Sequence, residues 1–435
     1  MAEIFPFAAL RYNPQKVRLQ DVITQPYDKI SPQMQQDYYE ASPYNLVRII
    51  LGQPHGAETE RDNRYTQAAA YLKSWMREGV LSQDNSPSIY AYSQKFNIPG
   101  TNRTAERRGF IAAGRLHEYS EKIVFRHEQT LAKPKSDRLN LLRATRAHFG
   151  QIFMLYSDPA QSIDSLLFDD DHYAWQQVLD EYGVEHRIRR ISEPAILNIV
   201  QTEMADRKLI IADGHHRYET ALNFRNELAA SKAANSLSVG AQAAMMTFVN
   251  MDSTGLVILP THRVVHGLND FDAEQFLIHA RDSYDVKSLG LSNTEEIKSA
   301  LAESGKKTNS FVAAIRNKLY LLAARPGASD RLPAEFSSRQ RRLDVVHLHA
   351  LILEQLLGIS REQITNQQHI RYLRDAGEAL EQARNDSAVN VAFLMNPVSI
   401  EQVREIAFSG EVLPQKSTDF FPKLLSGLAI YLLDG

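Results

Sequence analysis

The chain has 435 residues, of which 43% are hydrophobic and 23% charged, and this composition is typical of a globular protein with two or three domains. Its formal net charge of −3 excludes a general electrostatic attraction to nucleic acid or to membranes. The absence of cysteine excludes disulfides, thiolate catalysis and cysteine-based metal sites. The sequence shows neither a long apolar run nor a secretion signal, so we expect a cytoplasmic protein without a membrane partner.

Residues 1–120 are predicted to form an N-terminal α/β region. The expected elements are a helix over 32–41, a strand over 42–51, a helix over 61–79 and a hairpin of strands over 88–96 and 109–116. Arg48 interrupts the apolar strand and faces either a cleft or solvent. Three arginines in the hairpin link, Arg103, Arg107 and Arg108, are expected on a solvated turn rather than at an anion site.

Residues 121–270 are predicted to form the central α/β region, and its first informative stretch is the sequence from His127 to Arg138. A strand over 123–126 leads into this run of ionisable and hydroxyl groups, which does not suit a core element. Loops held by strands often carry catalytic groups. Glu128 is therefore a candidate general base or metal ligand, and Asp137 and Arg138 are candidates for substrate binding. A solvated surface loop is the alternative interpretation.

The second informative stretch of this region is the sequence LIIADGHHRYETAL, residues 209–222. An apolar strand ends at Asp213, Gly214 permits a tight turn, and a helical pattern begins at His215. Helix N-termini carry unpaired N–H groups and a partial positive charge, so this turn suits a phosphate. A carboxylate beside phosphate is costly unless it holds a metal ion, a sugar hydroxyl or a reacting proton. Alternatively, Asp213 caps the helix, the two histidines are solvated and Arg217 pairs with a surface acid.

The other expected elements, before and after residue 270, continue the α/β pattern. Residues 271–435 are predicted to form a C-terminal α/β region that packs on the core. We expect a helix over 139–149, strands over 151–156, 244–251 and 256–265, helices over 273–284 and 293–303, a hairpin over 311–323, a helix over 344–358, a strand over 387–395 and helices over 400–408 and 423–433. His262 and Arg263 interrupt a strand with polar groups and are candidates for substrate binding.

The polar stretch before the last predicted helix contains Lys416, Ser417, Thr418 and Lys423. A lysine followed by two hydroxyl residues is similar to the end of a P-loop, but the glycine spacing of that motif is missing. These four residues are candidates for phosphate contacts, and a purely structural loop is the alternative.

Several motifs occur together and in order, namely QPYDKI, HEQT, PKSDR, ADGHHRYETAL, GLVILPTHR and LPQKSTDFFPKLLSGL. Over nearly the whole chain, they resemble the bacterial and archaeal domain-of-unknown-function family one thousand and fifteen. The Asp-Gly-His-His-Arg segment is similar to the phosphate motif of the ParB/sulfiredoxin superfamily. The resemblance implies an α/β (α+β) fold in which residues 121–270 form a ParB/sulfiredoxin-like nucleotide-binding core with flanking α/β regions.

That superfamily includes nucleotide-binding partition proteins, an ATP-using sulfinic-acid reductase and kinases of free serine. The resemblance implies that Gly214, His215, His216 and Arg217 hold nucleotide phosphates. It further implies that Glu128 is the base for an acceptor hydroxyl and that Asp213 acts on that hydroxyl or on Mg²⁺. The expected cofactors are ATP or ADP, with CTP as an alternative, and Mg²⁺. The reductase activity is excluded because the chain lacks cysteine.

The leading hypothesis is a phosphotransferase that uses a nucleotide to phosphorylate a small hydroxyl compound, free L-serine being the best candidate, with Glu128, Asp213 and His216 as catalytic residues. The alternative is a ParB-like nucleotide-binding regulatory or partition protein without kinase activity. A third hypothesis is a metal hydrolase that uses His127, Asp137, Asp213, His215 and His216. The expected partners are the nucleotide and a small substrate. The net charge of −3 argues against a nucleic-acid partner, and a homo-oligomer is compatible with the sequence.

Overall fold

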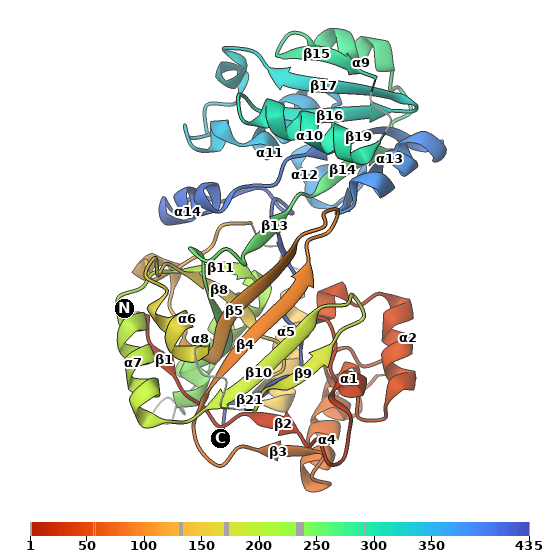
Figure 1. Ribbon diagram of the computed structural model, residues 1–435. Coiled ribbons are helices and arrows are strands. Elements are labelled where there is room, and N and C mark those ends of the chain that lie inside the picture. The colour runs from red at the N-terminus through yellow and green to blue at the C-terminus, as the bar shows by residue number, and fades with distance from the viewer. Residues whose placement is uncertain are drawn as a thin grey trace. The chain divides into compact units, whose positions relative to one another are not determined.

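The computed structural model describes residues 2–54, 56, 58–129, 134–168, 174–231, 239–290 and 293–434. The chain divides into two units: unit 1 comprises Met1–Arg126, Thr130–Val257 and Pro422–Gly435, and unit 2 comprises His127–Gln129 and Ile258–Phe421. The predicted α/β class is confirmed in both (Figure 1). The boundary predicted after residue 120 falls inside unit 1, whose main sheet takes strands from both sides of it. Within the described residues, we find no helix with the length and apolar character needed to cross a membrane.

Unit 1 is built on a nine-stranded mixed sheet in the order β6-β11-β8-β12-β5-β4-β10-β9, with β1 beside β5 (Figure 1). The strands are β1 (Ile4–Phe5), β4 (Ile89–Asn97), β5 (Thr104–Arg115), β6 (Val124–Phe125), β8 (Ile152–Tyr156), β9 (Gln176–Leu179), β10 (Glu185–Ile191), β11 (Leu209–Asp213) and β12 (Ala243–Asn250). β8 is apolar at every position because it is buried on both faces of the sheet. The predicted hairpin is confirmed as β4 and β5, and its antiparallel register places Gln94 opposite Arg107.

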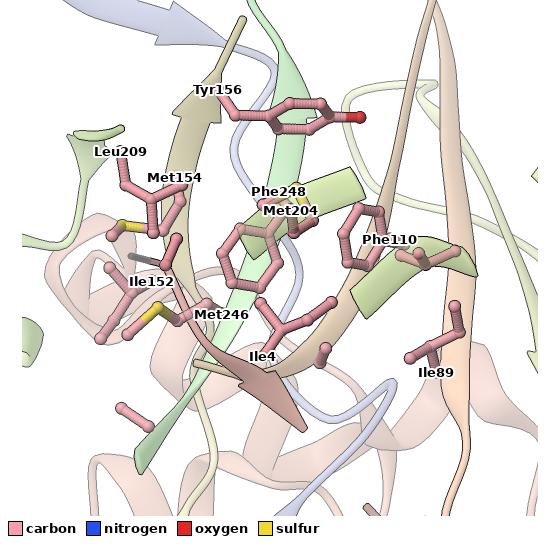
Figure 2. Packing of buried hydrophobic residues seen from close by; sticks show 14 of the residues in the cluster. Ile4, Ile89, Phe110, Ile152, Met154, Tyr156, Met204, Leu209, Met246 and Phe248 are labelled. Carbon is pink, nitrogen blue, oxygen red and sulfur yellow. The ribbon is translucent and has the colours of Figure 1, made fainter. Parts of the chain in front are cut away.

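Unit 1 also contains helices and a two-stranded antiparallel sheet of β2 (Leu10–Tyr12) and β3 (Leu81–Gln83). The helices are α1 (Leu19–Val22), α2 (Pro32–Ala41), α3 (Val47–Ile50), α4 (Arg64–Arg77), α5 (Pro134–Thr145), α6 (Ser162–Phe168), α7 (Pro194–Ala205) and α8 (His215–Ala230). Figure 2 shows Met204 of α7 among Met154, Phe110 and Phe248 of the sheet. Each such side chain contributes roughly 1.5–3 kcal/mol of burial free energy, and this cluster holds β11 and α8 in place.

Unit 2 contains a six-stranded antiparallel sheet in the order β15-β17-β16-β19-β14-β18 (Figure 1). The strands of this unit are β13 (Val257–Leu259, which begins at the unit boundary), β14 (His262–His266), β15 (Tyr284–Leu289), β16 (Ser310–Ile315), β17 (Lys318–Ala324), β18 (Ile370–Leu373), β19 (Val389–Met395) and β20 (Asp419–Phe421). Its helices are α9 (Ala273–Ala280), α10 (Thr294–Gly305), α11 (Asp344–His347), α12 (Arg361–Thr365), α13 (Ala376–Asn385) and α14 (Ile400–Phe408). Helices α10 and α13 supply apolar side chains to one core with the central strands. A π-helical stretch, Leu348–Leu356, continues α11.

Two predicted elements are wrong because tertiary contacts override local pattern. Residues 42–51 contain helix α3 rather than a strand, since Asn45 accepts a hydrogen bond from the Val47 N–H at 2.9 Å and donates to the Asp21 carbonyl at 2.8 Å. Residues 423–433 form no helix: Ser426 and Ile430 form isolated β-bridges, and Gly427 between them has a φ of 99°. Strand β21 (Tyr431–Leu432) of the same stretch pairs with β7 (Ala147–His148).

Other differences concern where elements end. The strand predicted over 256–265 is divided into β13 and β14. The helix predicted over 273–284 ends at Ala280, and strand β15 begins at Tyr284. Only a short turn separates helix α9 from strand β15. The apolar residues of both elements therefore fitted one helical spacing, and the sequence predicted one long helix.

Candidate functional site

The turn between β11 and α8 has the predicted strand, glycine and helix arrangement. Gly214 is the N-cap of α8 with a φ of 89°, a left-handed conformation that favours glycine. It has no side chain to cap the first N–H groups of the helix. Asp213 instead forms an ion pair with Arg217, whose Nη2 lies 3.2 Å from the Asp213 Oδ2. The alternative in which Asp213 is the N-cap therefore does not describe this turn.

The electrostatic surroundings of Asp213 favour an anion. Burial alone would raise the pKa of the Asp213 carboxyl, but nearby positive charges outweigh burial and hold that pKa well below its usual range. These charges belong to Lys423, Arg217, Lys29 and His215. Three permanent cations beside one carboxylate leave a net positive site at a helix N-terminus, which suits phosphate groups.

The positive charges around Asp213 also affect its predicted role as a metal ligand. Mg²⁺ is commonly bound by one or two carboxylates together with the phosphates of a substrate. Within the described residues, no three histidine, aspartate or glutamate side chains gather as a metal site. The cations around Asp213 disfavour a metal held by protein groups alone. The Mg²⁺ prediction therefore applies to an ion that arrives on nucleotide phosphates, and the metal-hydrolase hypothesis has no cluster to support it among those residues.

Gln151 connects this turn to the C-terminal segment of unit 1. Its backbone carbonyl accepts a hydrogen bond from Arg217 Nη1, and its side-chain amide donates to the carbonyl of Leu425 at 3.0 Å. The hydroxyl of Thr247 donates to its Oε1. Arg217 is thus fixed from two directions, by Asp213 and by Gln151.

A buried pair from the β4–β5 hairpin holds the neighbouring residues of the same segment. Gln94 donates to the carbonyl of Lys423 at 2.8 Å, and Arg107 Nη2 donates to the carbonyl of Pro422 at 2.5 Å. Arg107 is only 1% exposed, and burial lowers its pKa to about 10, so it remains a cation near neutral pH. The expectation of a solvated turn was wrong for Arg107 because β5 begins at Thr104 and draws it into the sheet.

A small, largely apolar pocket lies beside Arg217 in unit 1. Its volume is about 70 Å³. The walls include Tyr27, His148 and Phe149, and burial lowers the pKa of His148 to about 4, so this imidazole is neutral near pH 7. Arg138 also lines the pocket, with its guanidinium carbon 4.2 Å from the centre of the Tyr27 ring. Aromatic walls next to the cationic turn suit a flat ring such as a nucleobase.

The other predicted substrate residues of unit 1 have local partners. Asp137 accepts hydrogen bonds from Arg138 Nε at 2.8 Å and from the Tyr65 hydroxyl at 2.8 Å. Arg48 donates to the Tyr39 carbonyl at 2.7 Å, and its guanidinium carbon lies 4.4 Å from the centre of the Tyr39 ring. Arg138 is thus the member of this group that lines the pocket beside Arg217.

Glu128 lies in unit 2, where its backbone forms a β-bridge with Leu413. Its Oε1 accepts from the Lys416 N–H at 2.9 Å, and its Oε2 lies 3.4 Å from the Thr418 hydroxyl. The Thr418 hydroxyl is also 2.7 Å from His127 Nε2. Lys416 has a φ of 58°, so the loop turns sharply around the carboxylate. Glu128 is therefore a positioned carboxylate with a hydrogen bond to each oxygen.

Arg263 and His262 lie next to each other on β14 in unit 2. Arg263 Nη2 donates to the Lys416 carbonyl at 3.1 Å, so the same residue links Arg263 and Glu128. His262 is 2% exposed, and its Nδ1 accepts from the Met395 N–H at 3.1 Å. Ser417 donates to the Pro414 carbonyl at 2.6 Å. The predicted residues are thus divided between the two units. Unit 1 contains Arg48, Asp137, Arg138, Asp213–Arg217 and Lys423, and unit 2 contains Glu128, His262, Arg263 and Lys416–Thr418.

We predict that Gly214→Ala lowers both stability and nucleotide affinity. An added Cβ would lie 3.0 Å from Arg217 Nε, and an L-residue in this left-handed conformation costs roughly 1–2 kcal/mol. Urea unfolding measures the free-energy loss and calorimetric titration with ADP measures the affinity. Gly150→Ala is the matched control, because its Cβ would lie 3.5 Å from Arg217 Nη1, an ordinary contact. Equal stability of the two variants would contradict the prediction.

We predict that the protein loses stability in mild acid because His262 is buried in its neutral form. Burial, together with the charges of Arg263 and Lys298, lowers the pKa of folded His262 to about 4, whereas an unfolded histidine has a pKa near 6.5. As the pH falls from about 6.5 to about 4, the unfolded chain binds a proton that the folded chain does not, and stability falls by at most about 1.4 kcal/mol per pH unit.

Urea unfolding across this window is expected to show a shallower pH dependence for His262→Gln than for the unsubstituted protein. His279→Gln replaces an exposed histidine of the same unit and is expected to retain the full slope. Identical slopes in all three proteins would show that His262 does not contribute.

Residues 4–346 match the family described as "Protein of unknown function (DUF1015)", and the chain belongs to this family. The resemblance to this family is thereby confirmed over residues 4–346, and the similarity of the Asp-Gly-His-His-Arg segment to the ParB/sulfiredoxin phosphate motif stays a prediction. No curated protein matches the chain significantly.

Solved structures of low sequence identity also resemble the chain. A conserved hypothetical protein from Pyrococcus furiosus is 12% identical, with 72% of this chain and 93% of that chain covered and a TM-score of 0.36. A substituted free serine kinase in complex with AMP is 12% identical, with coverages of 77% and 95% and a TM-score of 0.37. SbnI from Staphylococcus aureus, with a C-terminal truncation, is 10% identical, with coverages of 74% and 87% and a TM-score of 0.34.

Proposed function

We propose that the protein is a nucleotide-dependent phosphotransferase that acts on a small hydroxyl compound, with free L-serine as the first acceptor to test. The observation that carries this proposal is the cationic turn of unit 1, in which Lys423, Arg217 and Lys29 surround the ionised Asp213 at the N-terminus of α8. The pocket beside Arg217 supplies aromatic walls for a base. Gly214, His215 and His216 are the proposed phosphate contacts of the turn, and Arg138 borders the base.

Phosphoryl transfer requires mainly positioning and charge neutralisation. The acceptor oxygen forms a bond to phosphorus while the bond from phosphorus to the bridging oxygen of the nucleotide breaks. The proton of the acceptor hydroxyl passes to a base, for which Glu128 is our candidate, and Arg217 and Lys423 offset the charge that develops on the phosphoryl oxygens. Mg²⁺ bound to the phosphates would supply further charge neutralisation. The roles of Asp213 and His216 in catalysis stay predictions.

The direct test is incubation of purified protein with Mg²⁺, either ATP or ADP, and a panel of hydroxyl compounds that includes L-serine, L-threonine and glycerol. Phosphorus NMR detects a phosphomonoester product and identifies the donor by its loss. We expect O-phospho-L-serine from at least one donor. The absence of product from every combination would contradict the proposal.

A nucleotide-binding regulatory protein without transfer activity is the second candidate. It is favoured by the contacts of Glu128, since both carboxylate oxygens are already engaged by the 416–418 loop. A carboxylate that only holds a loop needs no proton transfer. Nucleotide binding without turnover would support this candidate, and CTP belongs in the binding assay beside ATP and ADP.

A further inference from the structure

The largest polar cavity of unit 2 among those we describe has no role in the function proposed above. Its volume is about 580 Å³, and Arg263, Lys307, Asp344, Ser399 and Ser417 contribute to its walls. It lies wholly within unit 2, between the ends of β14 and β19 and the start of α14.

Arg263 is the most unusual group in this cavity. It is 1% exposed, its Nη1 donates to the Thr261 carbonyl and its Nη2 to the Lys416 carbonyl. Its Nε is buried and has no hydrogen-bond partner in the part of the chain that the structure describes. A buried guanidinium N–H without a partner is costly, and a ligand that accepts from it would remove that cost.

Three other charged groups that line the cavity, Lys306, Arg342 and Asp344, already have protein partners. Lys306 pairs with Glu303 and Arg342 pairs with Glu405, so those two cations are already neutralised. Asp344 accepts from Asn309 at 3.0 Å, from the Ser310 N–H at 3.3 Å and from Asn396 at 3.2 Å, so its oxygens face protein donors.

Lys307, an exposed residue, and Arg263 add two positive charges to this cavity. The N-terminus of α14, capped by Ser399, adds a partial positive charge to the same wall. When the negative charge of Asp344 is counted against those of Arg263 and Lys307, the cavity remains positive on balance.

We propose that this cavity binds a small molecule through an oxyanion group, a phosphate or a carboxylate, which accepts a hydrogen bond from Arg263 Nε. The proposal does not depend on phosphoryl transfer. Since Arg263 and Glu128 bind opposite sides of the Lys416 backbone, occupancy of the cavity also stiffens the loop that positions Glu128.

Calorimetric titration tests the site with two probes, inorganic phosphate and succinate, at constant ionic strength. Protein carrying Arg217→Gln is used throughout so that the cationic turn of unit 1 contributes less to phosphate binding. We expect one binding event for at least one probe, and the probe that binds identifies the oxyanion. In this background, Arg263→Gln is expected to weaken binding about tenfold or more, and Lys307→Ala about threefold, because each removes a charge from the wall.

Lys318→Ala is the matched control, since it removes an exposed lysine at the start of strand β17, outside the cavity, and is expected to leave binding unchanged. Hydrogen exchange should slow at the Lys416 amide when the probe is bound. Lys307→Ala keeps the test valid if Arg263→Gln fails to fold. No binding of either probe, or binding unaffected by both Arg263→Gln and Lys307→Ala, would overturn the proposal.

Discussion

Glu128→Gln is expected to slow phosphoryl transfer by about a hundredfold to ten-thousandfold, the usual contribution of a general base. The amide has the shape of the carboxylate and still accepts from the Lys416 N–H, so the loop keeps its conformation. It cannot take up the proton of the acceptor hydroxyl. Nucleotide affinity, measured by calorimetry, is expected to change by less than about twofold, because the proposed phosphate contacts belong to other residues.

Glu295→Gln provides the control for this experiment, because it removes an exposed carboxylate from helix α10 of the same unit. Its rate should equal that of the unsubstituted protein. A Glu128→Gln variant with a normal rate would remove Glu128 from the mechanism. If neither the variant nor the unsubstituted protein transfers phosphate while both bind nucleotide, the regulatory candidate is favoured instead.

Arg217→Gln is expected to weaken ADP binding about a hundredfold, which corresponds to about 2.7 kcal/mol. The substitution removes a proposed phosphate-binding cation and the ion pair to Asp213. It also removes one of the charges that hold the pKa of Asp213 down, so part of the carboxylate's stabilisation is lost. Arg217→Lys should recover only part of the affinity, since a lysine cannot bond to Asp213, Gln151 and a phosphate in one planar arrangement.

Calorimetric titrations at several salt concentrations measure these affinities, and circular dichroism verifies that the variants are folded. Arg143→Gln is the control, because Arg143 pairs with Glu227 on the exposed side of α8. An unchanged ADP affinity for Arg217→Gln would show that the nucleotide does not bind at this turn.

The strand, turn and helix around Gly214 could be predicted because every signal there is local. The apolar run of β11 is buried, the glycine takes the positive φ that the turn requires, and the helical period begins directly after it. The resemblance to the family then suggested which of these residues to propose as phosphate contacts, a choice that the local pattern alone did not allow.

The contacts that support this turn could not be predicted from local pattern. Gln94 and Arg107 are polar residues in strands, and they are buried only because segment 422–425 returns to cover them. The predicted hairpin did contain one indication of this contact. If its two strands are extended by a few residues in the same register, Gln94 lies opposite Arg107. The apolar stretch 423–433 was misinterpreted for the same reason, since its side chains are buried by partners distant in sequence rather than by a helix packing on one face.

The path of residues 422–434 has a consequence for the order of events during synthesis. A chain emerges from the ribosome from its N-terminus, so all of residues 258–421 are available before Lys423. A nascent chain that ends at Phe421 contains every residue of unit 2, whereas its unit 1 still lacks the segment that pairs with Leu10 and β7. Lys423, whose charge has the largest effect among those that keep Asp213 ionised, is therefore synthesised only after every residue of unit 2, and the cationic turn is completed after that unit.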